Sequence, residues 1–80
     1  MKIKILTFGI TRDIIGADSL TLDFPAGSRV SDVQAHLADR FPPIKQLASL
    51  MIAVNAAYAK ADTLLHEFDE LALIPPVSGG

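Results

Sequence analysis

The sequence lacks cysteine altogether, and basic residues are few. Without a thiol, the chain can form no disulfide, no zinc–thiolate site and no cysteine nucleophile. Seven lysines and arginines are scattered along 80 residues, and the formal net charge is −2. Because binding to nucleic-acid phosphates requires clustered cations, this charge pattern argues against a nucleic-acid partner.

Long apolar runs are also missing. The longest, residues 50–54, is far shorter than the roughly 18 residues that a membrane-spanning helix requires. The apolar stretch that follows Lys4 is interrupted at Thr7 and at Arg12-Asp13, before the hydrophobic region of a signal peptide develops. We therefore expect a cytoplasmic protein with no membrane partner.

The two histidines do not indicate a metal site. His36 lies within a helical pattern and His66 in an acidic segment, without the close spacing that metal ligands show. The acidic segment, residues 67–70, is itself typical of a solvated turn. We expect no metal and no permanently bound cofactor.

The periodicity of the apolar residues predicts one small α+β domain. Short alternating or β-branched runs predict strands at residues 2–8, 19–24, 50–55 and 70–74, with a weaker strand at residues 55–58. A helix is predicted by apolar residues at three- and four-residue steps, namely Val30, Val33, Leu37 and Phe41. Ser28 or Ser31 would cap this helix and Pro42-Pro43 would end it. Single helical turns are expected at residues 11–15 and 62–65.

This order of elements favours a β-grasp roll, in which a mixed sheet of four to five strands carries one main helix on one face. The domain is expected to span residues 1–76, and residues 77–80 to form a flexible tail. Because strand side chains alternate, placing Ile3 and Ile5 in the core directs Lys2, Lys4, Leu6 and Phe8 to the other face. In the same way, Leu71 and Leu73 in the core direct Ile74 outward.

The sequence closes on Pro75-Pro76-Val77-Ser78-Gly79-Gly80. Neither proline can donate to a sheet ladder, so the last strand must end there. The extended chain from Pro76 onward reaches roughly 13 to 14 Å, and the two glycines keep it thin enough for a narrow channel in another protein. The α-carboxylate of Gly80 is then the candidate reactive group, which ATP would activate as an acyl-adenylate before sulfur converts it to a thiocarboxylate. A frayed chain end is the alternative interpretation.

Three segments together resemble one known family. They are Lys4-Ile5-Leu6-Thr7-Phe8-Gly9 with Arg12-Asp13-Ile14-Ile15-Gly16, then Ile52-Ala53-Val54-Asn55, and finally Leu73-Ile74 followed by the closing run. They are similar to the small subunits of molybdopterin synthase, the MoaD-type ubiquitin-like sulfur carriers. The similarity runs the full length, and its ending is specific: a strand, two prolines, a hydrophobe, Ser or Thr, and Gly-Gly.

The resemblance implies a β-grasp sulfur carrier that is not an enzyme by itself. A ubiquitin-activating-type adenylyltransferase would consume ATP to adenylate Gly80, which would then become a thiocarboxylate. The loaded tail would enter the large subunit of molybdopterin synthase, which supplies the catalytic side chains. There its sulfur would attack precursor Z to help build the dithiolene of molybdopterin. Two carriers and two large subunits would form a heterotetramer.

The resemblance also implies an apolar partner-binding surface beside the tail, at Phe8, Tyr58 and Ile74, continued by Pro75, Pro76, Val77 and Ser78. The strand alternation independently places Phe8 and Ile74 on the open face. The alternative is that Phe8, Tyr58 and Ile74 are buried edges of the core. One departure concerns Phe68, which stands where the family usually has glycine. Because phenylalanine disfavours positive φ, we expect this turn to be rebuilt, with the ring against the core.

Two other functions remain open at the level of sequence. The first is a sulfur carrier for thiazole or another biosynthesis, although such carriers tend to be shorter and to lack residues 11–15. The second is a β-grasp protein modifier or interaction module without sulfur chemistry. A modifier would join Gly80 to a target lysine through an isopeptide bond.

Overall fold

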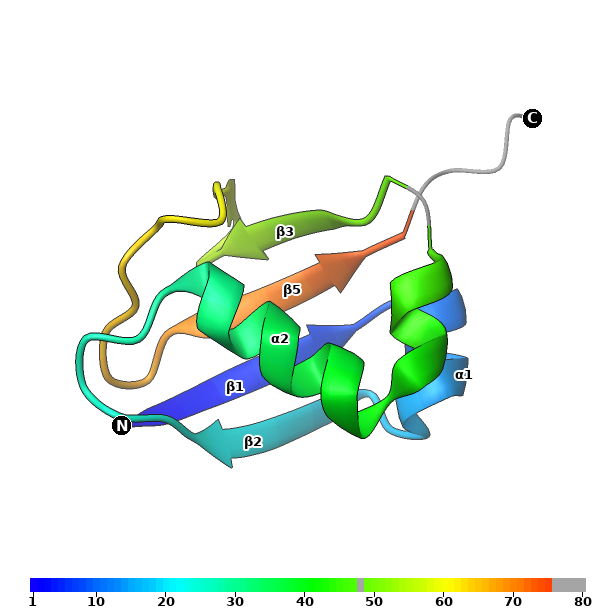
Figure 1. Ribbon diagram of the computed structural model, residues 1–80, viewed down its shortest axis with the longest axis horizontal. Helices are drawn as coiled ribbons and strands as arrows, with labels where there is room; N and C mark the ends of the chain where they lie inside the picture. The colour runs from blue at the N-terminus through cyan, green and yellow to red at the C-terminus, as the bar shows by residue number, and fades with distance from the viewer. Residues whose placement is uncertain (48, 76–80) are drawn as a thin grey trace.

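The computed structural model describes residues 1–47 and 49–75. Its strands form one mixed sheet in the order β2-β1-β5-β3-β4, and helix α2 (Val30–Arg40) lies across one face of it (Figure 1). The strands are β1 (Lys2–Thr7), β2 (Ser19–Asp23), β3 (Met51–Val54), β4 (Ala57–Tyr58) and β5 (Glu70–Ile74). The predicted α+β roll is confirmed. The predicted boundary after residue 76 lies outside the described residues.

Strands β1 and β5 form the parallel pair at the centre of the sheet, with Leu6 opposite Ala72. Antiparallel β2 covers the other edge of β1, and antiparallel β3 covers the other edge of β5. Because β1 and β5 run in the same direction, their carboxyl ends meet at one end of the sheet (Figure 1). The residues that follow Thr7 and Leu73 are therefore brought together.

Helix α2 begins after Arg29, so the prediction of a serine cap was wrong. The Arg29 N–H donates to the Asp32 carboxylate at 2.7 Å, whereas the Ser28 hydroxyl donates to the Pro25 carbonyl at 2.8 Å. The helix ends at Arg40, as the following prolines predicted. Those prolines open a short 3₁₀ helix, η1 (Pro42–Gln46).

Of the two short helical turns predicted, one is present. Helix α1 (Ile10–Ile15) ends at Gly16, which has φ of 83° and donates its N–H to the Arg12 carbonyl at 2.7 Å. Residues 62–65 are not helical, because Leu64 forms an isolated β-bridge with Arg29. This bridge carries Leu65 into the core, where it is almost fully buried.

The turn before β5 also differs from the prediction. Phe68 adopts φ of 65°, and 76% of it is exposed, so the ring does not fold onto the core. The Phe68 N–H donates to the Lys2 carbonyl at 2.8 Å, and the Lys4 N–H donates to the Asp69 carbonyl at 3.0 Å. These bonds to β1 hold the turn in a conformation that phenylalanine alone would avoid.

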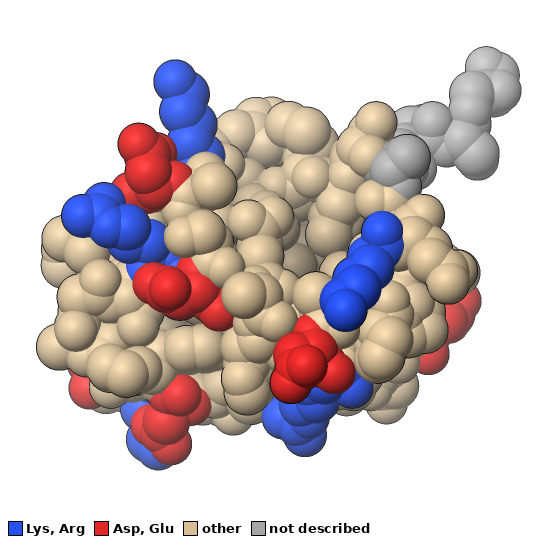
Figure 2. All heavy atoms as spheres, viewed as in Figure 1, with Lys and Arg blue, Asp and Glu red and all other residues tan. Residues whose placement is uncertain are grey.

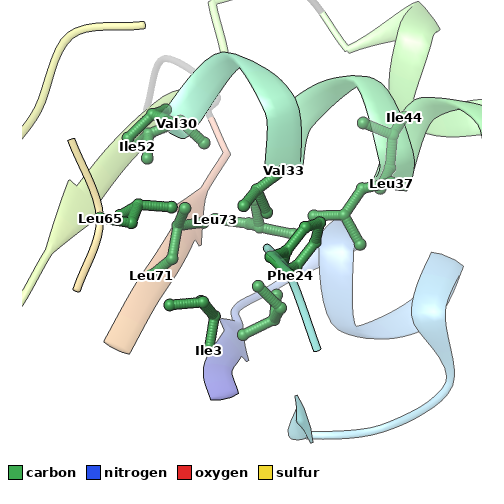
Figure 3. Packing of buried hydrophobic residues seen from close by; sticks show 11 residues of the cluster. Ile3, Phe24, Val30, Val33, Leu37, Ile44, Ile52, Leu65, Leu71 and Leu73 are labelled. Carbon is green, nitrogen blue, oxygen red and sulfur yellow. The ribbon is translucent and has the colours of Figure 1, made fainter. Parts of the chain in front are cut away.

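The core is a single layer between α2 and the sheet (Figure 3). Val30, Val33 and Leu37 project from the helix toward buried residues of the strands, among them Ile3, Leu71 and Leu73. Phe41, the last residue of the predicted stripe, is only partly buried at the end of the helix. The predicted apolar face of α2 is therefore confirmed from Val30 to Leu37.

Positive and negative side chains are interspersed on the face that carries α2 (Figure 2). They do not gather into a patch of one sign there. No helix among the described residues is both long enough and apolar enough to cross a membrane.

Replacement of Leu71 by alanine tests the core. Leu71 is fully buried on the central strand, so Leu71→Ala should lower the free energy of unfolding by about 2 to 5 kcal/mol through lost burial and a residual cavity. Urea denaturation measures the change. Leu64→Ala is the matched control because Leu64 is 44% exposed, and equal losses for the two variants would contradict this placement of the core.

Candidate functional site

The face of the sheet opposite α2 carries an open groove of about 560 Å³, which we call the outer groove. Its lining comes from β1, β3, β4 and β5 and the turns that join them: Leu6, Phe8, Ala53, Asn55, Ala56, Tyr58, Glu70, Ala72 and Ile74. Most of these side chains are apolar, although the groove is open to solvent. Open apolar surfaces of this kind mark interaction sites.

Strand alternation explains why these side chains share one face. In β1, Ile3, Ile5 and Thr7 are buried, whereas Lys2 and Lys4 are exposed. Phe8 continues the exposed series and is 50% exposed, as the sequence predicted. Ile74 lines the same groove from the end of β5.

The three predicted contact residues therefore lie together. Phe8, Tyr58 and Ile74 all line the outer groove, and Tyr58 is 71% exposed. The alternative that all three are buried edges of the core is wrong. What remains a prediction is that a partner binds them.

The floor of the groove was missed by sequence reasoning. Strand register places Leu6 opposite Ala72, Ala72 opposite Ala53, and Ala53 opposite Tyr58. Two small side chains thus occupy the middle of a row that has larger side chains at both ends. The alternation of β3 and β5 shows which face these alanines take, but only the pairing shows that they are neighbours.

Tyr58 is presented by a tight hairpin between β3 and β4. Val54 pairs with Ala57, and the two residues between them, Asn55 and Ala56, have φ of 50° and 69°. Positive φ at both central positions is the geometry that a two-residue hairpin loop favours. Asparagine tolerates this conformation better than alanine does, so Ala56 is held there by its surroundings.

Asn55 ties this hairpin to the start of β5. Its side-chain amide donates to the Asp69 carboxylate at 2.9 Å, and its side-chain carbonyl accepts the Glu70 N–H at 3.0 Å. Asp69 also accepts the His66 N–H at 2.8 Å and is buried. The prediction of a solvated acidic turn was therefore wrong for Asp69, which is a structural acceptor.

A second anchor lies at the end of β5, where the tail begins. The fully buried Thr11 hydroxyl accepts a hydrogen bond from the Phe8 N–H at 2.8 Å. It can donate its own proton to the Phe8 carbonyl at 2.7 Å or to the Leu73 carbonyl at 3.2 Å. Gly9 has φ of 54°, and a Cβ built there would lie 3.4 Å from Pro75 Cγ. The corner after β1 is therefore packed against the first proline of the closing run.

The remaining predicted site residues, Pro76, Val77, Ser78, Gly79 and Gly80, lie outside the described residues. Their roles stay predictions. Among residues 1–47 and 49–75, no three or more histidine or acidic side chains cluster as metal ligands would. His36 instead packs edge-on against Phe24, with ring centroids 5.4 Å apart.

Comparison with known proteins gives a consistent result. The ThiS family model matches residues 5–80. A molybdopterin synthase sulfur carrier subunit from Arabidopsis thaliana is 36% identical over 81 residues, which cover 100% of this chain and 84% of the relative.

Solved structures share the fold over nearly the whole chain. A Pyrococcus furiosus protein, provisionally described as subunit 1 of molybdopterin-converting factor, has a TM-score of 0.89 and 29% identity, covering 96% of this chain and 99% of that one. Small archaeal modifier protein 1 from Methanosarcina acetivorans has a TM-score of 0.84 and 28% identity, and the match covers 99% of this chain and 96% of that one. A complex of subunits 1 and 2 of molybdopterin-converting factor from Helicobacter pylori contains a chain with a TM-score of 0.72 and 23% identity, covering 100% of both, a likeness of fold alone.

Thr11→Val tests the anchor at the end of β5. Valine keeps the shape of threonine but leaves the Phe8 N–H without its acceptor, which should cost about 1 to 3 kcal/mol of stability. Thermal unfolding measures the loss, and Thr11→Ser, which keeps the hydroxyl, should recover most of the hydrogen-bonding part. A valine variant as stable as the parent would show that the hydroxyl anchors nothing.

Proposed function

This chain belongs to the ThiS family, and from that premise we propose that it is the sulfur carrier subunit of a molybdopterin synthase. It would act in the cytoplasm and donate sulfur from a thiocarboxylate at Gly80. The support comes from full-length relatives that carry this description and from the geometry at the end of β5. The catalytic side chains would belong to the large subunit.

One observation carries the proposal. The outer groove and the base of the tail meet at the same end of the sheet, since Ile74 lines the groove and Pro75 packs beside Gly9. A partner that docks on the groove is therefore next to the point where the closing run begins. Docking and chemistry can then be separate tasks of one small domain.

The chemistry at Gly80 would proceed in two steps outside this chain. An adenylyltransferase of the ubiquitin-activating type binds the tail, and the Gly80 carboxylate attacks the α-phosphate of ATP, which releases pyrophosphate. A sulfur donor then displaces AMP from the acyl-adenylate and leaves a thiocarboxylate. Nothing in this sequence requires a resident cofactor, because the sulfur is carried covalently.

The loaded tail would then enter the large subunit. Phe8, Tyr58 and Ile74 would hold that subunit on the outer groove while the thin Gly79-Gly80 end reaches its active site. There the thiocarboxylate sulfur would attack precursor Z. Water would then cleave the bond between this sulfur and the Gly80 carbonyl carbon, which restores the Gly80 carboxylate and leaves the sulfur as part of the dithiolene of molybdopterin. Two such carriers on two large subunits would complete the heterotetramer.

A second candidate function is protein modification. The likeness to small archaeal modifier protein 1 favours it, at a TM-score of 0.84 and 28% identity. In that case the activated Gly80 would form an isopeptide bond with a lysine of a target protein. A carrier for thiazole synthesis is disfavoured by helix α1 (Ile10–Ile15), because such carriers tend to lack residues 11–15.

Loading of the tail tests the proposed chemistry. After incubation with the activating enzyme, Mg-ATP and a sulfur donor, intact mass should show one oxygen replaced by sulfur. A variant that lacks Gly80 should not be loaded, yet it should unfold at the parent Tm, because the core is built from residues between Ile3 and Leu73. An unchanged mass with the cognate enzyme, or an isopeptide adduct in its place, would overturn the sulfur-carrier assignment.

Tyr58→Ala tests the docking surface. Tyr58 is exposed, so its removal should leave the Tm unchanged while it weakens binding to the large subunit by about 10- to 100-fold, as expected for an aromatic contact at an interface. Titration calorimetry measures the Kd. Leu64→Ala removes an exposed apolar side chain outside the groove and serves as the control. Equal affinities for the Tyr58 variant and the parent would exclude the groove as the docking surface.

A further inference from the structure

Phe68 occupies a position that its own conformation disfavours. Its φ of 65° lies in the left-handed region, where a bulky side chain is rare and glycine is preferred. The ring recovers little from burial, because 76% of the residue is exposed. Stability of the isolated domain therefore does not account for a phenylalanine here, whereas a contact with another molecule would.

The ring lies on the open face of the sheet. It lines a shallow depression of about 380 Å³ together with Lys2, Lys4, Thr21 and Glu70, and we call these five residues the Phe68 ledge. Glu70 also lines the outer groove, so the ledge and the groove are continuous. A molecule seated in the groove meets the ledge as it extends toward the start of β5.

The ledge combines apolar surface with an available cation. Lysine stems beside an aromatic ring offer apolar surface while their ammonium groups stay at the rim. The Lys2 ammonium pairs with Asp23 at 3.0 Å. The Lys4 side chain has no hydrogen bond or ion pair with the part of the chain that the structure describes. Lys4 stands opposite Glu70 in the strand register, but no ion pair joins the two side chains. The Lys4 ammonium is thus left to pair with a carboxylate from outside.

We propose that the large subunit extends from the outer groove onto the Phe68 ledge, with an apolar side chain against Phe68 and a carboxylate against Lys4. This inference rests on the proposed function and adds a residue that selects the partner. The ledge stands at the start of β5 and the tail leaves from its end, about 13 to 16 Å away for a five-residue strand. Contacts at both ends of β5 fix the direction of the partner along the strand, and so the approach of the tail to its active site.

Phe68→Gly separates this role from a structural one. Glycine relieves the backbone conformation, so the Tm should stay the same or rise, while Kd for the large subunit of the same organism should increase about 5- to 20-fold. Phe68→Ala loses the ring but keeps the strained φ, so it should weaken binding equally without the gain in Tm. Lys4→Glu should also weaken binding, because it places a carboxylate opposite the partner's carboxylate. The increase in Kd should be larger at low salt than at high salt, since salt screens the repulsion.

The outcomes distinguish the inference from the function on which it rests. If the parent protein fails to bind the large subunit, the proposed function fails. A second outcome is that the parent binds, Tyr58→Ala weakens binding and Phe68→Gly does not. The outer groove is then the docking surface, and the proposed role of the Phe68 ledge is overturned. If Phe68→Gly instead raises only the KM of adenylation by the activating enzyme, the ledge belongs to that enzyme and the large-subunit assignment is wrong. Tighter binding by Lys4→Glu would overturn the acidic contact.

Discussion

The parallel pairing of β1 with β5 is the constraint on which the rest of this molecule depends. It places two alternating segments side by side, so that Ile3, Ile5, Leu71 and Leu73 form one buried surface beneath α2. Alternation then obliges every second residue of both strands to face the other way. The open face is therefore a direct consequence of how the core is built, and the same pairing brings the ends of both strands together where Pro75 begins the closing run.

Three of the four non-glycine residues with positive φ in the described chain lie on the open face. Asn55 and Ala56 line the outer groove and Phe68 lines the ledge, whereas Ser49 lies elsewhere. Hydrogen bonds and packing from neighbouring elements hold them: Asn55 bonds to Asp69, and Phe68 bonds to β1. Such strained positions persist where the surrounding structure determines them, and they cluster at functional sites. The helix-covered layer supplies the stability that lets the other face hold an exposed apolar groove.

Much of the fold could be predicted because its signals are local. The apolar period of α2, the alternation of β1 and the proline stop after Arg40 each depend on residues close in sequence. The errors arose where other groups of the fold compete for a residue. Ser28 does not cap the helix because its hydroxyl donates to the nearby Pro25 carbonyl, and Leu64 is not helical because it bridges to the distant Arg29. Asp69 is buried rather than solvated because Asn55, fourteen residues away, donates to it.

The sequence by itself determined which face each side chain of β1 and β5 takes, and so that Phe8 and Ile74 lie on the open face. Period-two alternation is a property of a single strand, and it needs no knowledge of neighbours. Only the tertiary structure decided that Ala72 and Ala53 form the floor between Leu6 and Tyr58, and that Phe68 stands beside Lys4. These neighbours lie far apart in the chain. Their contact depends on strand order and register, which long-range backbone hydrogen bonds and burial of the whole core select together.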